Sequence, residues 1–164
     1  MTMEIDDLKF EDIKSRAKKY YDDLNEIRCP YLGQEVHFGS AGFEHLLTKS
    51  WNRGRSRAEQ YTRLRLVRLA VKVIENSHTL QEYDERKSFV RQKTNSRWEQ
   101  HAKNVFYYVF IALFPDKGIR LKVVVKQIEG GLPFFWSIYP SWRIEKDGNG
   151  SDKKIFYSGN LEED

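Results

Sequence analysis

Residues 36–80 read VHFGSAGFEHLLTKSWNRGRSRAEQYTRLRLVRLAVKVIENSHTL, and the rest of the expected fold is arranged around them. A short extended start over residues 36–38 is followed by two helical patterns, which an arginine-rich turn at residues 52–57 joins. The turn contains a glycine and no apolar residue, which is typical of a chain reversal. In the second pattern, apolar residues occupy most of the circumference of the helix, so we expect the rest of the chain to bury it.

The first pattern predicts a helix over residues 41–51, with the Ser40 hydroxyl as its N-cap. Its apolar side consists of Phe43, Leu47 and Trp51. His45 and Lys49 are four residues apart and therefore share a different side of the helix, one above the other. Because the arginine-rich turn follows directly, we expect an imidazole, an ammonium and several guanidinium groups close together.

The second pattern predicts a helix over residues 58–75. Its apolar arc consists of Leu64, Leu66, Val67, Ala70, Val71, Val73 and Ile74. Arg65, Arg68 and Lys72 fill the narrow polar strip that remains. Arg63 falls inside the apolar arc, so its side chain either extends outward to solvent or is paired at an internal site.

Positive charge is concentrated in the same stretch. Between Leu46 and Ile74 the chain has eight basic residues and the single acid Glu59, a local charge of +7, whereas the whole chain carries +4. The basic residues are Lys49, Arg53, Arg55, Arg57, Arg63, Arg65, Arg68 and Lys72. Clustered guanidinium groups attract polyanions, so we expect a phosphate-bearing partner. A solvated basic face without a partner is the alternative.

The remaining segments give a helix and then strands. An amphipathic pattern over residues 7–28 predicts a helix that ends before Pro30. Thr79 to Tyr83 suits a first strand, and the polar segment that follows, up to residue 104, suits a loop, an edge strand or a short helix. Three apolar or alternating runs then predict strands joined by tight turns, at residues 105–114, 119–128 and 133–140. Helices followed by an antiparallel meander define an α+β class.

The expected organisation has three parts. They are an N-terminal helical extension (residues 1–30), an α+β domain (31–144) and an acidic, flexible tail (145–164). Within the tail, residues 155–158 (IFYS) suit a short edge strand.

Composition narrows the class of protein. With 164 residues, 40% hydrophobic and 14% aromatic, the chain is not disordered as a whole. No apolar run approaches the ~20 residues of a membrane span, and the first dozen residues are too acidic for a signal peptide. The single cysteine, Cys29, excludes an internal disulfide. We therefore expect a cytoplasmic protein with no membrane partner.

Metal and cofactor chemistry are not indicated. The chain has no Walker loop, dinucleotide-binding glycine motif, nucleophile elbow or paired-histidine zinc helix. The sequence between residues 105 and 140 has only two carboxylates, Asp116 and Glu129, and both fall in turns, whereas two-metal nucleases need carboxylates around their core strands. We expect no cofactor and no metal.

Metal-free RNA cleavage needs other groups: an acid, a base and cations that hold the phosphate oxygens. These groups are offered by His45, Lys49, Arg53, Arg55 and Arg57. Strand alternation also predicts that Phe135, Ser137 and Tyr139 point the same way, giving a hydroxyl and two rings that suit an unstacked base. A surface histidine and plain core aromatics are the alternatives.

The chain resembles the superfamily of nucleases that groups barnase, EndoU, the colicin ribonucleases and RelE, in particular its phage-associated and toxin-like branches. The resemblance covers roughly residues 36–140 and lies in the VHF-x4-FEHLLTK opening, a second helix ending in IENSHTL, the antiparallel strands and the closing FFWSIYP. It implies helices on a roughly four-stranded antiparallel sheet. It also implies active-site roles for His45 and for Ser137 and Tyr139, with Lys126 and either His78 or His101 as further candidates.

Three functions are compatible with these features. The first is a metal-independent endoribonuclease, a toxin-type or phage-defence effector that cleaves tRNA or mRNA by attack of the 2′-hydroxyl, with a possible cognate inhibitor or antitoxin. Arg55, Arg57, Arg65, Arg68, Lys126 and Phe135 would then bind the substrate, beside the catalytic set of His45, Lys49, Arg53, Ser137 and Tyr139. The second is a non-catalytic RNA- or DNA-binding module on the same fold. The third is a protein-interaction domain that docks its partner through the N-terminal helix.

Overall fold

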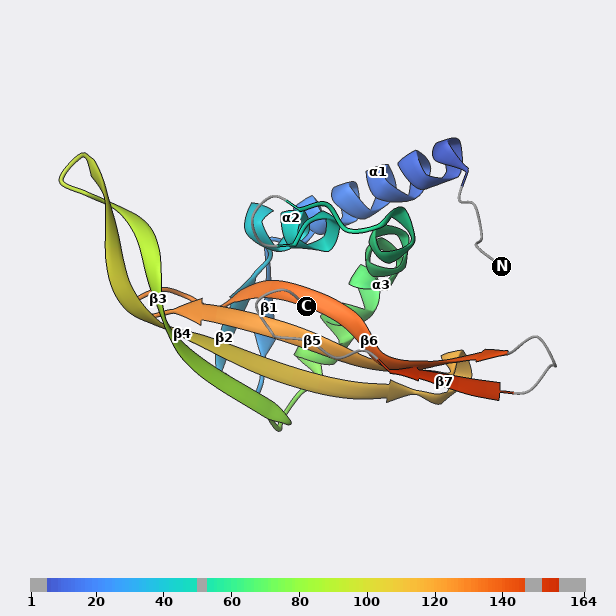
Figure 1. Cartoon of the computed structure of the whole chain (residues 1–164). Helices are drawn as coiled ribbons and strands as arrows, with labels where there is room; N and C mark the ends of the chain where they lie inside the picture. The colour runs from blue at the N-terminus through green and yellow to red at the C-terminus, as the bar shows by residue number, and fades with distance from the viewer. Residues whose placement is uncertain (1–5, 50–52, 147–151, 157–164) are drawn as a thin grey trace.

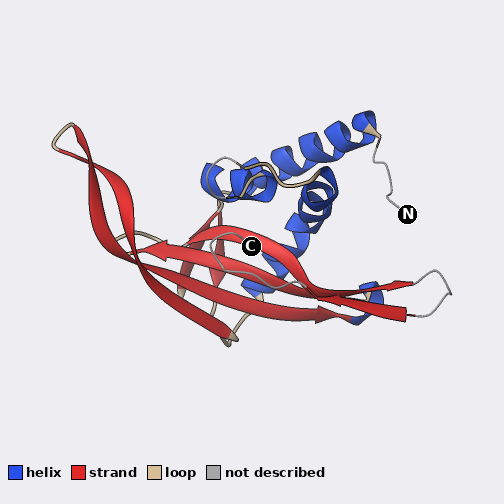
Figure 2. Cartoon of the chain, viewed as in Figure 1, coloured by secondary structure: helices blue, strands red, loops and turns tan. Residues whose placement is uncertain are grey.

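The protein has an α+β architecture in which helices lie against one mixed β-sheet (Figure 1; Figure 2 shows the element types). The structure, a computed structural model, describes residues 6–49, 53–146 and 152–156. Its helices in these ranges are α1 (Asp7–Leu24), α2 (Ser40–Leu47), α3 (Arg57–Glu75) and the short 3-10 helix η2 (Pro115–Lys117). Its strands are β1 (Glu26–Cys29), β2 (Gln34–His37), β3 (Glu82–Thr94), β4 (Arg97–Phe114), β5 (Ile119–Ile128), β6 (Phe134–Lys146) and β7 (Asp152–Phe156).

The sheet is larger and more mixed than the sequence predicted. Its strand order is β1-β2-β6-β5-β4-β3, and β7 pairs with the distal end of β6. β3 to β6 form the expected antiparallel meander, but β2 joins β6 in parallel through the single pair His37 and Phe134. The expectation of about four antiparallel strands is therefore right for the class and wrong in extent, because short strands before α2 and after residue 151 join the meander.

The predicted helix over residues 7–28 is four residues too long. α1 ends at Leu24 because Asn25 leaves the helical conformation, with φ of 56° and ψ of −69°. The next four residues form β1, which pairs with β2 across a turn at Gly33. Pro30 thus ends a strand, and tertiary pairing overrides the local helical pattern.

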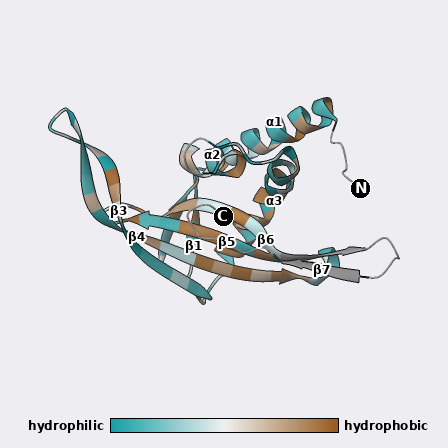
Figure 3. Ribbon diagram, viewed as in Figure 1, coloured by the Kyte–Doolittle hydropathy of each residue, from teal (hydrophilic) through white to brown (hydrophobic). Residues whose placement is uncertain are grey.

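The main core lies between the helices and one face of the sheet. α3 buries the apolar arc that the sequence predicted, including Leu64, Val67 and Ile74, and this arc packs with Phe110 of β4 and Leu121 of β5. α1 contributes its own buried residues to the same core, so the segment expected as an N-terminal extension packs with the rest. Figure 3 shows hydrophobic residues along β4 and on α3. No helix in the described part of the chain is long and apolar enough to cross a membrane.

The ambiguous segment before residue 104 forms most of a long hairpin. β3 and β4 pair over thirteen positions, from Glu82 with Val109 to Thr94 with Arg97. β3 is the last strand on its side of the sheet, so of the three alternatives the edge strand is correct. In the tail, β7 is also an edge strand, although it begins at Asp152 rather than at residue 155. Residues 147–151 and 157–164, where we expected flexibility, lie outside the described residues.

Candidate active site

The middle of β6 has one edge that faces helices instead of a strand. β2 meets this edge at Phe134 and β7 meets it from Trp142 onward, while β5 pairs with the opposite edge. Over residues 135–141, none of the described strands pairs with the helix-facing edge. α2 packs here, and the side chain of Arg63 reaches the Ile138 carbonyl at 3.5 Å. Helical side chains can therefore meet residues of β6 around this edge.

Gly42 allows α2 to lie directly against β6. A Cβ atom at this position would stand 2.3 Å from the backbone oxygen of Phe135 and 2.6 Å from the Tyr21 hydroxyl, so only glycine fits. The helix starts differently from the prediction: Gly39 is its N-cap residue, with no side-chain cap, and Ser40 is its first helical residue. His45 lies one turn after Gly42 and is only 4% exposed.

His45 belongs to a stack of three groups. Its imidazole lies parallel to the indole of Trp136, with ring centroids 4.1 Å apart and planes inclined by 20°. The ammonium nitrogen of Lys126 lies 4.0 Å from the centroid of the same indole. Since the imidazole covers one face of the ring, the ammonium must lie over the other face. An indole between an imidazole and a cation is a favourable cation–π arrangement.

Arg55 holds His45 from the other side. Its Nε donates to the His45 carbonyl oxygen at 2.9 Å, and its Nη2 lies 3.1 Å from His45 Nε2. A guanidinium has donors only, so Nε2 accepts this bond and the neutral imidazole carries its proton on Nδ1. Arg55 is itself buried, at 5% exposure, and its Nη1 lies 3.6 Å from a Glu59 carboxylate oxygen. The imidazole therefore has a fixed tautomer and position.

Arg63 occupies an internal site, which decides between the two alternatives for this residue. Its Nη1 donates to the Ser137 hydroxyl at 2.8 Å, and its guanidinium carbon lies 5.4 Å from the centroid of the Tyr139 ring. All three side chains are buried. The placement of an arginine inside an apolar helical arc was the only sequence signal for this pairing.

Phe135 and Tyr139 do not share a face, contrary to the alternation argument. The register between β5 and β6 shifts so that Val125 pairs with Phe135 and Val124 pairs with Ser137, which leaves one extra residue on β6. Such a bulge reverses the alternation that follows it. Phe135 therefore packs in the main core, stacked on Phe38 at 5.1 Å, and belongs to the core rather than to a base-binding surface.

Tyr139 instead belongs to a second cluster on the opposite sheet face, which we call the outer cluster. It consists of Val105, Tyr107, Val109, Val124 and Tyr139, with Trp136 packed against it. Lys126 Nζ lies 5.5 Å from the Tyr107 ring as well as over Trp136, so one ammonium contacts both rings. Trp136 and Tyr107 were missed in the sequence because an apolar strand gives no sign of which rings meet a cation.

The sequence predicted that Lys49 shares a side of the helix with His45, and this prediction is wrong. α2 ends at Leu47, because Thr48 is extended, with φ of −131° and ψ of 151°. The chain then reverses through a bridge between Thr48 and Gly54, and the Lys49 amide donates to the Arg53 carbonyl at 2.7 Å. The side chain of Arg53 is exposed. Trp51, expected on the apolar side of the helix, lies outside the described residues.

The other predicted arginines lie around α1 and α3. Arg57 pairs with Asp7 of α1, and its guanidinium carbon lies 4.7 Å from the Phe10 ring centroid. Arg65 lies over Tyr61 and Arg68 lies over Tyr20, with guanidinium carbons 5.3 and 4.2 Å from the respective ring centroids. The eight basic residues therefore do not form one patch. Arg63 points toward β6 and Arg55 toward His45 of α2, whereas Arg57 points toward α1.

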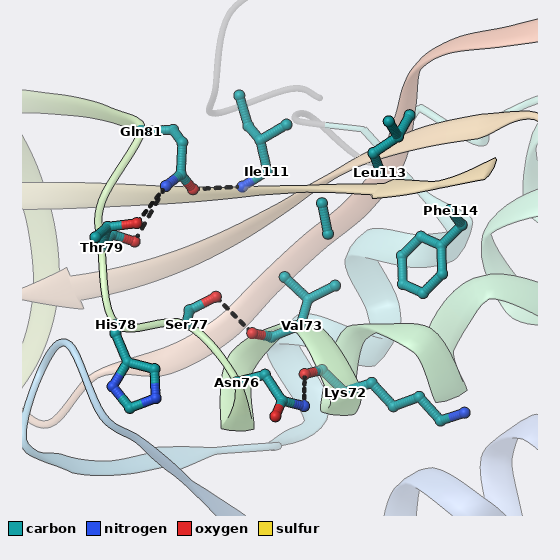
Figure 4. Close-up of a pocket in the computed structure, with 11 residues that line it drawn as sticks. Lys72, Val73, Asn76, Ser77, His78, Thr79, Gln81, Ile111, Leu113 and Phe114 are labelled. Atoms are coloured by element: carbon teal, nitrogen blue, oxygen red, sulfur yellow. Dashed lines mark hydrogen bonds between the residues drawn. The ribbon is translucent and has the colours of Figure 1, made fainter.

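The two further histidine candidates lie away from His45. His101 is in the β3–β4 hairpin, with Nε2 3.2 Å from a Glu99 carboxylate oxygen. His78 lines a separate cavity of about 420 Å³ between the end of α3 and the end of β4 (Figure 4), together with Lys72, Gln81 and Leu113. In Figure 4 the His78 ring lies at the rim, apart from the hydrogen-bonded Gln81.

The described residues contain no group of three or more histidine, cysteine or carboxylate side chains placed to hold a metal ion. Comparisons with models of protein families, with curated proteins and with solved structures gave no match to this chain.

Proposed function

We propose that the protein is a metal-independent endoribonuclease and that the RNA phosphate binds beside His45, Arg55, Arg63 and Lys126. The observation that carries this proposal is that His45, Lys126 and Arg63 contact neighbouring residues of β6 and that Arg55 binds His45. Arg55 and Lys126 flank the stacked rings of His45 and Trp136, and Arg63 contacts Ser137 and Tyr139 on the same strand. Arginine and lysine donors suit the non-bridging oxygens of a phosphate.

In the proposed reaction, the 2′-oxygen attacks the adjacent phosphorus and the bond from phosphorus to the 5′-oxygen breaks. The products are a 2′,3′-cyclic phosphate and a 5′-hydroxyl, and the leaving 5′-oxygen needs a proton. His45 is neutral, with Nε2 accepting from Arg55, so we assign it as the group that carries this proton. When the Arg55 guanidinium turns to the phosphate, Nε2 takes the proton of the 2′-hydroxyl, and the imidazolium so formed gives its Nδ1 proton to the leaving 5′-oxygen. The cations would stabilise the charge that develops on the phosphate.

The second candidate is binding of RNA without cleavage. It is favoured by the 4% exposure of His45 and by the contact between Arg55 and its Nε2, which are also compatible with a purely structural imidazole. The third function, docking of a partner protein through the N-terminal helix, has less support, because α1 buries Phe10, Ala17 and Tyr21 in the shared core.

The experiment is incubation of the purified protein with total RNA, with and without EDTA, followed by analysis of the ends produced. The proposal predicts cleavage in EDTA that leaves cyclic-phosphate ends. His45→Gln should abolish it, whereas His78→Gln, an exposed histidine elsewhere, should not. RNA that is bound but stays intact would establish the second candidate, and cleavage that requires a divalent metal would refute the proposed mechanism.

A further inference from the structure

The β3–β4 hairpin extends beyond the sheet as an arm (Figure 1). β5 pairs with β4 only from Val105 onward, so the eight pairs from Lys87–Asn104 to Thr94–Arg97 form a ribbon of two strands. At about 3.3 Å per residue, this arm is about 25 Å long. Asn95 and Ser96 close it in a tight turn with positive φ angles of 49° and 68°. A two-stranded ribbon gains little stability of its own in water, so its side chains are available for another role.

One face of this arm combines cations and aromatic rings. Residues of β3 at odd positions share a face with residues of β4 at even positions, because Phe89 pairs with Ala102 and Lys93 pairs with Trp98. We call this surface the basic arm face, and its residues are Lys87, Phe89, Arg91, Lys93, Trp98, Gln100, Ala102 and Asn104. These eight residues include three cations, two rings and no acid. Glu99 and His101, which pair with each other, lie on the opposite face.

The two rings of the basic arm face are exposed to an unusual degree. Phe89 is 76% exposed and Trp98 is 60% exposed. The guanidinium carbon of Arg91 lies 5.0 Å from the Trp98 centroid, so a cation already accompanies one ring. Phe89 and Trp98 are four positions apart in register, about 13 Å along the strands, with Arg91 between them. Cations and rings thus alternate along the length of the arm.

We infer that the basic arm face binds single-stranded RNA, with its cations on phosphates and with Phe89 and Trp98 stacked on bases. Single-stranded nucleic acid exposes both groups, and alternating cations and aromatic rings are the general means by which proteins bind it. Duplex RNA hides the faces of its bases, so it cannot use the rings. This site is separate from the His45 site, since the arm face continues the helix-covered side of the sheet and the outer cluster lies on the other side.

The form of the arm favours a nucleic acid over an anionic membrane. The tip is formed by the polar residues Asn95 and Ser96, and of the two rings only Trp98 lies close to it, whereas Phe89 lies six residues before it, about 20 Å away. A ribbon that inserted its tip into lipid could not bury both rings, but a strand of nucleic acid that follows the arm meets both. The choice of RNA over DNA rests on the proposed function; the stacking geometry itself does not distinguish them.

The test measures affinity for a 2′-O-methyl RNA oligonucleotide, which cannot be cleaved because its 2′-oxygen is blocked. Binding is therefore read independently of catalysis. Phe89→Ala combined with Trp98→Ala should weaken binding to the single strand at least about fivefold for each ring, with little effect on a duplex of the same sequence. Both side chains are exposed, so the melting temperature should stay near the wild-type value.

A second variant tests the cations. Replacing Lys87, Arg91 and Lys93 with glutamine should reduce the slope of log affinity against log salt by about 0.7 for each phosphate contact that is lost. The matched control replaces three exposed lysines outside the arm, Lys9, Lys19 and Lys117, and should leave the slope unchanged.

Three outcomes would overturn the inference. They are wild-type affinity in the ring variant, an equal loss of affinity for the duplex, and binding to phosphatidylserine vesicles, but not to RNA, that depends on the rings. The proposed catalysis fails separately. If His45→Gln cut RNA at the wild-type rate while the ring variant lost affinity for the uncleavable strand, the mechanism would be wrong and the arm site correct.

Discussion

Replacing Gly42 with alanine should push α2 away from β6. The added methyl group would stand 2.3 Å from the Phe135 carbonyl oxygen, 2.6 Å from the Tyr21 hydroxyl and 2.9 Å from the Phe135 ring, whereas ordinary contacts begin at 3.4 Å. The nearest of these atoms belongs to the backbone of a central strand, so it cannot rotate away. The helix must therefore move by about 1 Å, which is the difference between the required and the available distance.

The magnitude follows from two opposing contributions. Overpacking of this kind costs about 1–3 kcal/mol, and a contact with backbone favours the upper part of that range. Alanine in place of glycine inside a helix gains up to about 1 kcal/mol. The expected net loss of stability is about 1–2 kcal/mol, which corresponds to a fall in melting temperature of roughly 2–8 °C for a chain of this size.

The assay is thermal unfolding followed by far-ultraviolet circular dichroism. Gly54→Ala is the matched control, because a Cβ atom at Gly54 would meet nothing within 4 Å. This control should melt close to the wild type. A Gly42→Ala protein that melts at or above the wild-type temperature would show that α2 does not approach β6 as described, and the position of His45 would then be in doubt.

Three further changes test other parts of the structure. Burial raises the pKa of the Tyr21 phenol above its ordinary 10.0, so the unfolded chain ionises first and the stability should fall as the pH rises above 10. Tyr21→Phe should flatten this fall, and it should cost about 1 kcal/mol at neutral pH because it removes the hydrogen bond to the Gly39 carbonyl oxygen. If urea titrations gave both proteins the same dependence of unfolding free energy on pH, the assignment to Tyr21 would be wrong. Ser137→Ala should cost about 1.5–3 kcal/mol, because it removes an acceptor from the buried guanidinium of Arg63. Ser141→Ala should cost less, because the Ser141 hydroxyl donates only to the backbone carbonyl oxygen of Arg120, and both groups are uncharged. Equal urea midpoints for the two variants would contradict this difference. Burial also raises the pKa of the Cys29 thiol, so iodoacetamide should modify it only when the chain unfolds, and rapid labelling of the native protein would show that β1 opens.

Much of the fold follows from the sequence because one face of each core element is apolar. The apolar arc of α3 and the alternating apolar residues of β5 could both be predicted for this reason, and both pack in the main core. The arm could not be predicted from the sequence. An exposed two-stranded ribbon buries neither face, so residues 87–104 show no hydrophobic alternation.

The candidate site was predictable only in part. His45 and Lys126 both contact Trp136, and Ser137 and Tyr139 both contact Arg63, but nothing in the sequence indicated that Trp136 and Arg63 are the residues that join them. The orientation of Phe135 was not predictable, since the bulge in β6 depends on its pairing with β5. The exclusion of Lys49 from the helix has a similar cause, because the bridge at Thr48 ends α2 one turn before the amphipathic pattern ends.

Proton transfer by His45 during RNA cleavage is best tested by single-turnover cleavage with the His45→Gln protein in EDTA. The expected rate is about 10²- to 10⁴-fold below the wild type, with unchanged affinity for 2′-O-methyl RNA and with a wild-type rate for the His78→Gln control. Cleavage by the His45→Gln protein at the wild-type rate would show that His45 transfers no proton, and the absence of any cleavage by the wild-type protein would show that it is not a ribonuclease.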